Sequence, residues 1–101
     1  MFVKIPKADV LQSIGFALIS AEEEYTRVAT GIGESLKRML EDGEPIPIEA
    51  QEDATRALTK RRNNVEDIKT LKAMAEFTRD GDDVLLDIIS YRMLEPNLPA
   101  R

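Results

Sequence analysis

Apolar residues recur at alternating steps of three and four along the first stretch of the chain. The positions are Leu11, Ile14, Leu18, Ala21, Tyr25, Val28, Ile32, Ser35 and Met39. This spacing places them on one side of a helix, as in the seam of a coiled coil, and Ser35 is the one polar member. A weaker seam of the same kind follows at Ala54, Leu58, Arg61, Val65, Ile68, Lys72 and Ala75. We therefore expect two long helices that pack along these seams.

Proline and glycine mark where these helices should begin and end. Gly43 predicts the C-terminal stop of a first helix over about residues 7–42. Pro47 suits the first position of a second helix over about 47–79, and Gly81 suits its cap. The short connection between the two helices predicts an antiparallel hairpin.

A third helix is expected over about residues 82–94, capped by Asp82 or Asp83, and residues 95–101 are expected to be a flexible tail. No useful length of chain alternates β-branched or aromatic residues with polar ones, so we expect no strand. The predicted fold is all-α: one helical domain over 1–101, in which a long antiparallel hairpin and a short third helix complete a helical bundle through oligomerisation.

Folding the chain at its turn brings together residues whose numbers sum to 89 or 90. In this register Ile32 faces Ala57, and Ser35 faces Ala54. Arg61 lies on the second seam. Glu24 lies on the first helix, one helical turn from the residue that faces Arg61 in this register. Two interpretations of Arg61 stay open: a buried ion pair that fixes the register, or a side chain that extends its charge to water.

Glycine interrupts the first helix at Gly15, Gly31 and Gly33, where each residue costs on the order of 1 kcal/mol relative to Ala. The helix is therefore expected to bend or break near residues 31–33, or to tolerate these weak points. Alternatively, Ala29 and Gly33 lie one turn apart and offer a flat strip on which a neighbouring helix packs.

Large apolar residues exceed what a two-helix layer can cover. Burial yields roughly 25 cal/mol per Å² of apolar surface, so an interface of several hundred Å² would supply several kcal/mol. We expect a homo-oligomer, with a homodimeric four-helix bundle as the simplest closed form, or a subunit of a larger protein complex. The predicted interface residues are Phe2, Val3, Ile5, Phe16, Ile19, Ala29, Gly33, Phe77, Leu85, Ile88, Ile89 and Tyr91.

Composition removes most common catalytic and cofactor chemistry. The chain has no His and no Cys, which excludes Ser-His-Asp and Cys nucleophile sites, zinc sites with thiolate or imidazole ligands, and disulfides. With 14 Lys and Arg against 19 Asp and Glu, the net charge of −5 opposes attraction to nucleic acid, and residues 60–62 form the sole basic run. No apolar run approaches the ~18 residues of a membrane span, and no signal peptide is recognisable, so we expect a cytoplasmic protein.

One constellation of acidic residues is a candidate metal site. Glu22 and Glu23 on the first helix and Glu66 and Asp67 on the second come close in the predicted register. Clustered carboxylates bind iron, manganese or calcium, although di-iron bundles also use His, which this chain lacks. These residues lie outside the seams, and a solvated acidic face is the competing interpretation.

The sequence therefore predicts a non-enzymatic helical structural or interaction protein, such as a component of a virion, a secretion apparatus or a scaffold. It predicts no catalytic residue and no cofactor. One alternative is an all-carboxylate metal-binding, ferritin-like bundle. A second alternative is a regulatory adaptor that docks its third helix in a partner's groove.

Overall fold

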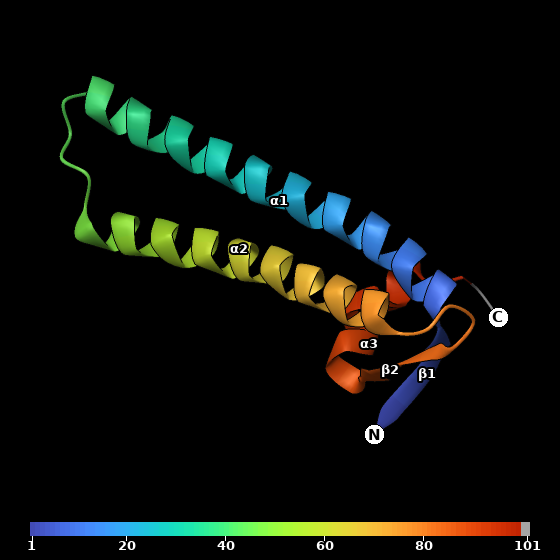
Figure 1. Cartoon of the computed structure of the whole chain (residues 1–101). Coiled ribbons are helices and arrows are strands. Elements are labelled where there is room, and N and C mark those ends of the chain that lie inside the picture. Colours follow the sequence, from blue (N-terminus) through green and yellow to red (C-terminus); the bar gives the residue numbers. More distant parts are fainter. Residues whose placement is uncertain (100–101) are drawn as a thin grey trace. The chain divides into compact units, whose positions relative to one another are not determined.

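The computed structural model describes residues 1–99, and most of them are helical (Figure 1). The elements are β1 (Phe2–Pro6), α1 (Lys7–Glu41), α2 (Ile48–Phe77), β2 (Asp83–Asp87), α3 (Ile88–Leu94) and the 3-10 helix η1 (Glu95–Asn97). They form two compact units. Met1–Ser20 and residues from 66 onward make the sheet unit, and Ala21–Val65 make the hairpin unit. Each unit contains part of α1 and part of α2.

The prediction of two long helices is confirmed, and α1 ends where its glycine signal indicates. Gly43 adopts a positive φ of 73°, a conformation that favours glycine. Its N–H donates to the carbonyl of Leu40 at 3.1 Å, and the N–H of Glu44 donates to the carbonyl of Met39 at 3.0 Å. This pair of bonds is a Schellman motif, which satisfies carbonyls that the helix end would leave unpaired.

The all-α prediction is wrong for two short segments, which pair as an antiparallel two-stranded sheet. Val84 and Leu86 on β2 are buried and lie opposite Ile5 and Val3 on β1. The full register runs Phe2↔Asp87, Val3↔Leu86, Lys4↔Leu85, Ile5↔Val84 and Pro6↔Asp83. Alternate residues of a strand point to opposite faces, so one face of the sheet joins the core and the other faces outward.

The third helix is consequently shorter than predicted and begins at residue 88 rather than 82. Its cap is Asp87, whose Oδ1 accepts from the Ser90 N–H at 2.7 Å, and not Asp82 or Asp83. This bond lowers the pKa of the Asp87 carboxyl. Residues 95–97, expected in a flexible tail, form η1, and residues 100 and 101 of that predicted tail lie outside the described residues.

The buried core lies mainly in the sheet unit. Its apolar members come from every long element of that unit: Ile5, Val10, Ile14, Ala17, Ile68, Leu71, Ala75, Val84, Leu86 and Leu94. Ser13 is also fully buried, and its Oγ donates to the Leu94 carbonyl at 2.8 Å. This bond satisfies the buried hydroxyl and joins α1 to the end of α3.

Within the hairpin unit, residues 21–41 of α1 and 48–65 of α2 are connected by the turn around Gly43. The helix α1 runs without a break through residues 31–33, which agrees with the alternative that it tolerates its glycines there. A Cβ added at Gly33 would meet nothing within 4 Å, so no described side chain or neighbouring helix packs closely on this end of the strip predicted with Ala29.

Candidate interaction surfaces

The hairpin unit has an apolar seam but no buried interior of its own. Its buried residues are Ala21 and Val65, which begin and end it, and no side chain between 22 and 64 is buried. Apolar residues on or beside the seams are half-buried instead: Tyr25, Val28, Ile32, Leu36, Met39, Ala54, Ala57 and Leu58. Two helices in one layer cover each seam from one side, so apolar surface stays in contact with water.

An open groove of 380 Å³ follows this seam near the turn. Its walls come from both helices: Gly31, Ile32, Ser35, Leu36 and Met39 of α1, and Ala50, Asp53, Ala54 and Ala57 of α2. Ile32 with Ala57 and Ser35 with Ala54 are pairs that the predicted register places opposite each other. Most of the lining side chains are small or aliphatic, so the groove suits an apolar helix face better than a charged ligand.

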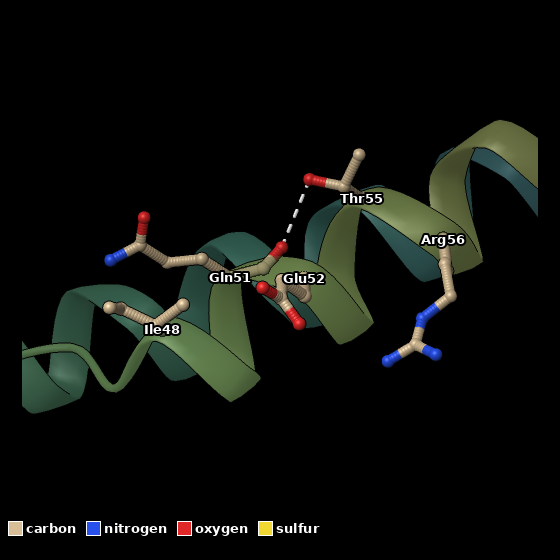
Figure 2. Close-up of a pocket in the computed structure, with 5 residues that line it drawn as sticks. All are labelled: Ile48, Gln51, Glu52, Thr55 and Arg56. Carbon is tan, nitrogen blue, oxygen red and sulfur yellow. Dashed lines mark hydrogen bonds between the residues drawn. The ribbon is translucent and has the colours of Figure 1, made fainter.

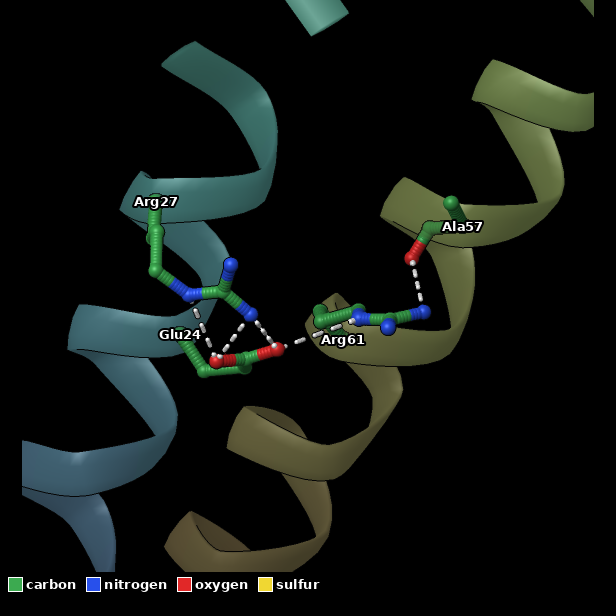
Figure 3. A network of polar contacts seen from close by, with 4 residues as sticks. All are labelled: Glu24, Arg27, Ala57 and Arg61. Carbon is green, nitrogen blue, oxygen red and sulfur yellow. Dashed lines mark hydrogen bonds and ion pairs between the residues drawn. The ribbon is translucent and has the colours of Figure 1, made fainter. Parts of the chain in front are cut away.

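A polar network crosses the hairpin unit beside the seam (Figure 3). The Arg61 Nε lies 3.9 Å from the Glu24 Oε1, and the Arg61 Nη1 donates to the Ala57 carbonyl at 3.4 Å. Arg27 holds Glu24 more closely, with Nη2 2.7 Å from Oε1 and Nε 3.1 Å from Oε2. The hydrogen bond from Arg27, with added charge from Arg27 and Arg61, lowers the pKa of the Glu24 carboxyl.

This arrangement falls between the two interpretations of Arg61. The guanidinium reaches across to α1 and back to its own helix, so it is not simply extended into water. Its side chain is 31% exposed and that of Glu24 is 40% exposed, so the ion pair is not buried either. A half-exposed pair of this kind supports the register of the two helices and contributes little stability.

A second depression lies on the first turns of α2 (Figure 2). Ile48, Gln51, Glu52, Thr55 and Arg56 line it, and the Thr55 Oγ1 donates to the Gln51 carbonyl at 3.0 Å. All five side chains belong to one helix, and the surface is open. Ile48 is 72% exposed and adds an apolar side chain at the turn end of the hairpin unit.

Most of the predicted interface residues of the sheet unit are exposed. Those with large exposed side chains are Phe2, Phe16, Ile19, Phe77, Leu85, Ile88 and Ile89, with Phe77 at 91%. Val3 and Tyr91 are half-buried. Ile5 is only 8% exposed, so it belongs to the core and is not available as an interface residue. In the hairpin unit, Ala29 is half-buried and Gly33 is exposed.

The acidic metal candidates remain on the surface. Glu22, Glu23, Glu66 and Asp67 are all exposed, and the Glu66 carboxylate lies 3.8 Å from the Lys69 Nζ on the same helix. Across residues 1–99, no three acidic side chains gather closely enough to hold a metal ion. In the basic run, Arg61 is engaged with Glu24, while Lys60 and Arg62 are exposed.

The sequence interpretation named Phe2, Val3 and Ile5 as interface residues but missed that residues 2–6 form a strand, which offers a sheet edge as well as apolar side chains. The signal was the short alternation of Val3 and Ile5 with Phe2 and Lys4. A single alternating run of this length is weak evidence for a strand when the partner strand is not known.

No protein-family model matches the chain, and comparisons with curated proteins and with solved structures find no match. Within the part of the chain that the structure describes, no helix combines the length and apolar character needed to cross a bilayer. Inference about function therefore depends on the surfaces of the chain itself.

Proposed function

We propose that this chain is a non-enzymatic helical structural or interaction protein that associates with copies of itself, as a homo-oligomer or within a larger assembly. The observation that carries the proposal is the absence of any buried side chain between residues 22 and 64, although both helices of this segment have a largely apolar seam. A virion, a secretion apparatus or a scaffold would each use such a subunit.

Physical reasoning favours a partner for the hairpin unit. Most of the stability of a helix in a protein comes from packing its apolar face, and here that face is packed by one neighbouring helix alone. Another pair of helices laid in the groove beside Ile32, Leu36 and Ala57 would remove their remaining surface from water. The result would be a four-helix arrangement with an interior.

The two alternative functions have less support. A metal-binding bundle needs converging ligands, whereas the acidic candidates are exposed and Glu66 already has Lys69 nearby. An adaptor that releases α3 would have to extract Leu94, which is fully buried and whose carbonyl is bound by Ser13. No specific observation favours either function over self-association.

Light scattering coupled to size-exclusion chromatography tests the proposal on the intact chain. We expect a mass that is a multiple of 11.4 kDa at micromolar concentration. Ile32→Glu, which places a charge in the groove, should lower the mass relative to that of the wild type. The matched control is Thr30→Glu, which adds the same charge at an exposed position of α1 outside the groove lining and should leave the mass unchanged.

A wild-type chain that remains a folded monomer over the whole accessible concentration range would overturn self-association. Mass spectrometry of the intact complex from its source then separates a homo-oligomer from an assembly that includes other proteins. Circular dichroism of each variant verifies that a change of mass does not reflect unfolding.

A further inference from the structure

The strand β1 has one paired edge and one edge without a strand partner in residues 1–99, because the sheet has two strands. The direction of its backbone groups follows from the hydrogen bonds beside it. The N–H of Lys7 donates to the carbonyl of Asp82 at 3.1 Å, and these two residues continue the register of the sheet by one pair. In an antiparallel ladder such hydrogen-bonded pairs alternate along the strands.

By this alternation, the N–H and C=O groups of Val3 and Ile5 point toward β2, whereas those of Phe2, Lys4 and Pro6 point toward the free edge. Pro6 agrees with this assignment, because a residue without an N–H fits a position that donates nothing to β2. The free edge therefore presents two donors, the N–H groups of Phe2 and Lys4, and the carbonyls of the same residues.

We propose that β1 pairs with β1 of a second copy of this chain, antiparallel about a twofold axis at Val3, so that the two sheets become one continuous sheet. In this register Phe2 of each copy lies opposite Lys4 of the other. Each Phe2–Lys4 pair exchanges two backbone hydrogen bonds, which use both free-edge donors of each copy. The inference rests on the proposed self-association and adds a contact between two copies besides the groove of the hairpin unit.

Side-chain chemistry selects this register over its neighbour. Phe2 and Lys4 are exposed on the outward face, and Phe2 is 68% exposed. In the paired sheets, the ammonium of Lys4 from one copy reaches the ring of Phe2 from the other and covers part of its exposed surface. A shift by two residues would place Lys4 opposite Lys4 and Phe2 opposite Pro6. Like charges directly opposite each other oppose pairing.

Charged side chains on β2 discourage pairing at its free edge. Its outward residues are Asp83, Leu85 and Asp87, and antiparallel pairing of β2 with a second β2 about Leu85 would set Asp83 against Asp87 twice. Acidic side chains on an edge strand discourage such pairing. Pairing of β1 with β2 of another copy would not close on itself and would grow into polymers, whereas the β1–β1 contact closes as a dimer.

Proline substitution tests the free edges of β1 and β2 independently. Lys4→Pro removes one free-edge donor from each copy and leaves the bonds between β1 and β2 in place, so we expect dimerisation at this contact to weaken by about 10- to 100-fold. Asp83→Pro is the matched control, because it removes one charge and one outward N–H from the edge of β2 at a residue outside the predicted interface. It should leave the dissociation constant from sedimentation unchanged, with circular dichroism verifying that both variants fold.

Cross-linking tests the register and does not depend on a proline variant folding. The chain has no cysteine, and Val3→Cys places two thiols at a pair that is not hydrogen-bonded, with Cα atoms about 4.5 Å apart, within the range that a disulfide spans. We expect a reducible covalent dimer on oxidation by glutathione disulfide. Asp83→Cys, on the outward face of the other strand and outside the predicted interface, should give only background cross-linking.

The outcomes separate the strand contact from the proposed function. If the wild type self-associates but Lys4→Pro does not weaken it and Val3→Cys does not cross-link, β1 pairing is wrong and self-association through the groove stands. Cross-linking at Asp83→Cys as efficient as at Val3→Cys would also overturn the β1–β1 contact. A wild-type chain that is monomeric throughout would overturn both.

Discussion

Lys7 joins the start of α1 to the end of α2, and its replacement by methionine should destabilise the sheet unit. The Lys7 Nζ donates to the Thr78 carbonyl at 2.6 Å and to the Asp80 Oδ1 at 2.9 Å, with a longer bond to the Glu76 carbonyl at 3.4 Å. Its side chain is only 14% exposed. Methionine retains most of the aliphatic stem but cannot donate, so it isolates the loss of these bonds.

The magnitude is set mainly by the carbonyl contacts. A hydrogen bond from a charged donor contributes about 1.5 to 3 kcal/mol, and a cation beside the C-terminal end of a helix adds a few tenths or more. The Asp80 side chain is 99% exposed, so its ion pair with Lys7 adds little. We expect Lys7→Met to lower the free energy of unfolding by about 2 kcal/mol, which for a chain of this size is roughly 10 °C in Tm.

Urea denaturation followed by circular dichroism at 222 nm measures this loss, at one fixed protein concentration because association also affects stability. Lys69→Met is the control, since the Lys69 Nζ lies 3.8 Å from Glu66 on the same helix and its side chain is 51% exposed. It should cost less than about 0.5 kcal/mol. Equal losses in the two variants would refute the assignment of a stabilising role to Lys7.

Three further effects are expected. Ser13→Ala removes a buried hydroxyl whose bond to α3 is 2.8 Å long, and chemical denaturation should show a loss of about 1 kcal/mol; an unchanged midpoint would contradict this. Gly33→Ala introduces a methyl group into open space within α1, and thermal melts at low concentration should show a gain of up to about 1 kcal/mol, whereas a loss would indicate a hidden close contact. The hydrogen bond from Lys7 lowers the pKa of Asp80, so its contribution is present above the ordinary carboxyl pKa of about 4 and lost as pH falls through the lower folded value; an acid titration of stability should show this part disappear in Lys7→Met.

The hairpin was predictable because its signals are local. Steps of three and four set the helix faces, and Gly43 fixed the end of α1 through a conformation that other residues rarely adopt. The sequence left open whether the helix continues through residues 31–33, because Gly31 and Gly33 lower helix propensity without necessarily ending a helix whose seam continues on both sides.

The sheet was missed because its evidence is distributed over the length of the chain. Residues 83–87 are a short segment with an Asp at each end and three apolar residues between them. Over five residues, periodicity alone does not distinguish a strand from a buried helix. Their partner strand, residues 2–6, lies almost the whole chain away, so neither segment is stabilised by its neighbours in sequence. Cross-strand packing against the core decides the conformation.

The candidate surfaces were predictable to different degrees. The groove follows from the register of the two seams, which places Ile32 opposite Ala57. The apolar surplus indicated exposed residues such as Phe77, yet it did not separate them from Ile5, whose burial depends on pairing with Val84. The free edge of β1 could not be anticipated, since an edge exists only once a sheet does.

Hydrogen exchange at two protein concentrations tests self-association of the hairpin unit most directly. Amides within residues 22–64 should exchange more slowly at high concentration than on dilution, because association would cover the half-buried seam. Amides near Ile14, in the core of the sheet unit, serve as the internal reference. Protection in residues 22–64 that is the same at every concentration, in a chain that stays folded, would contradict self-association through this surface.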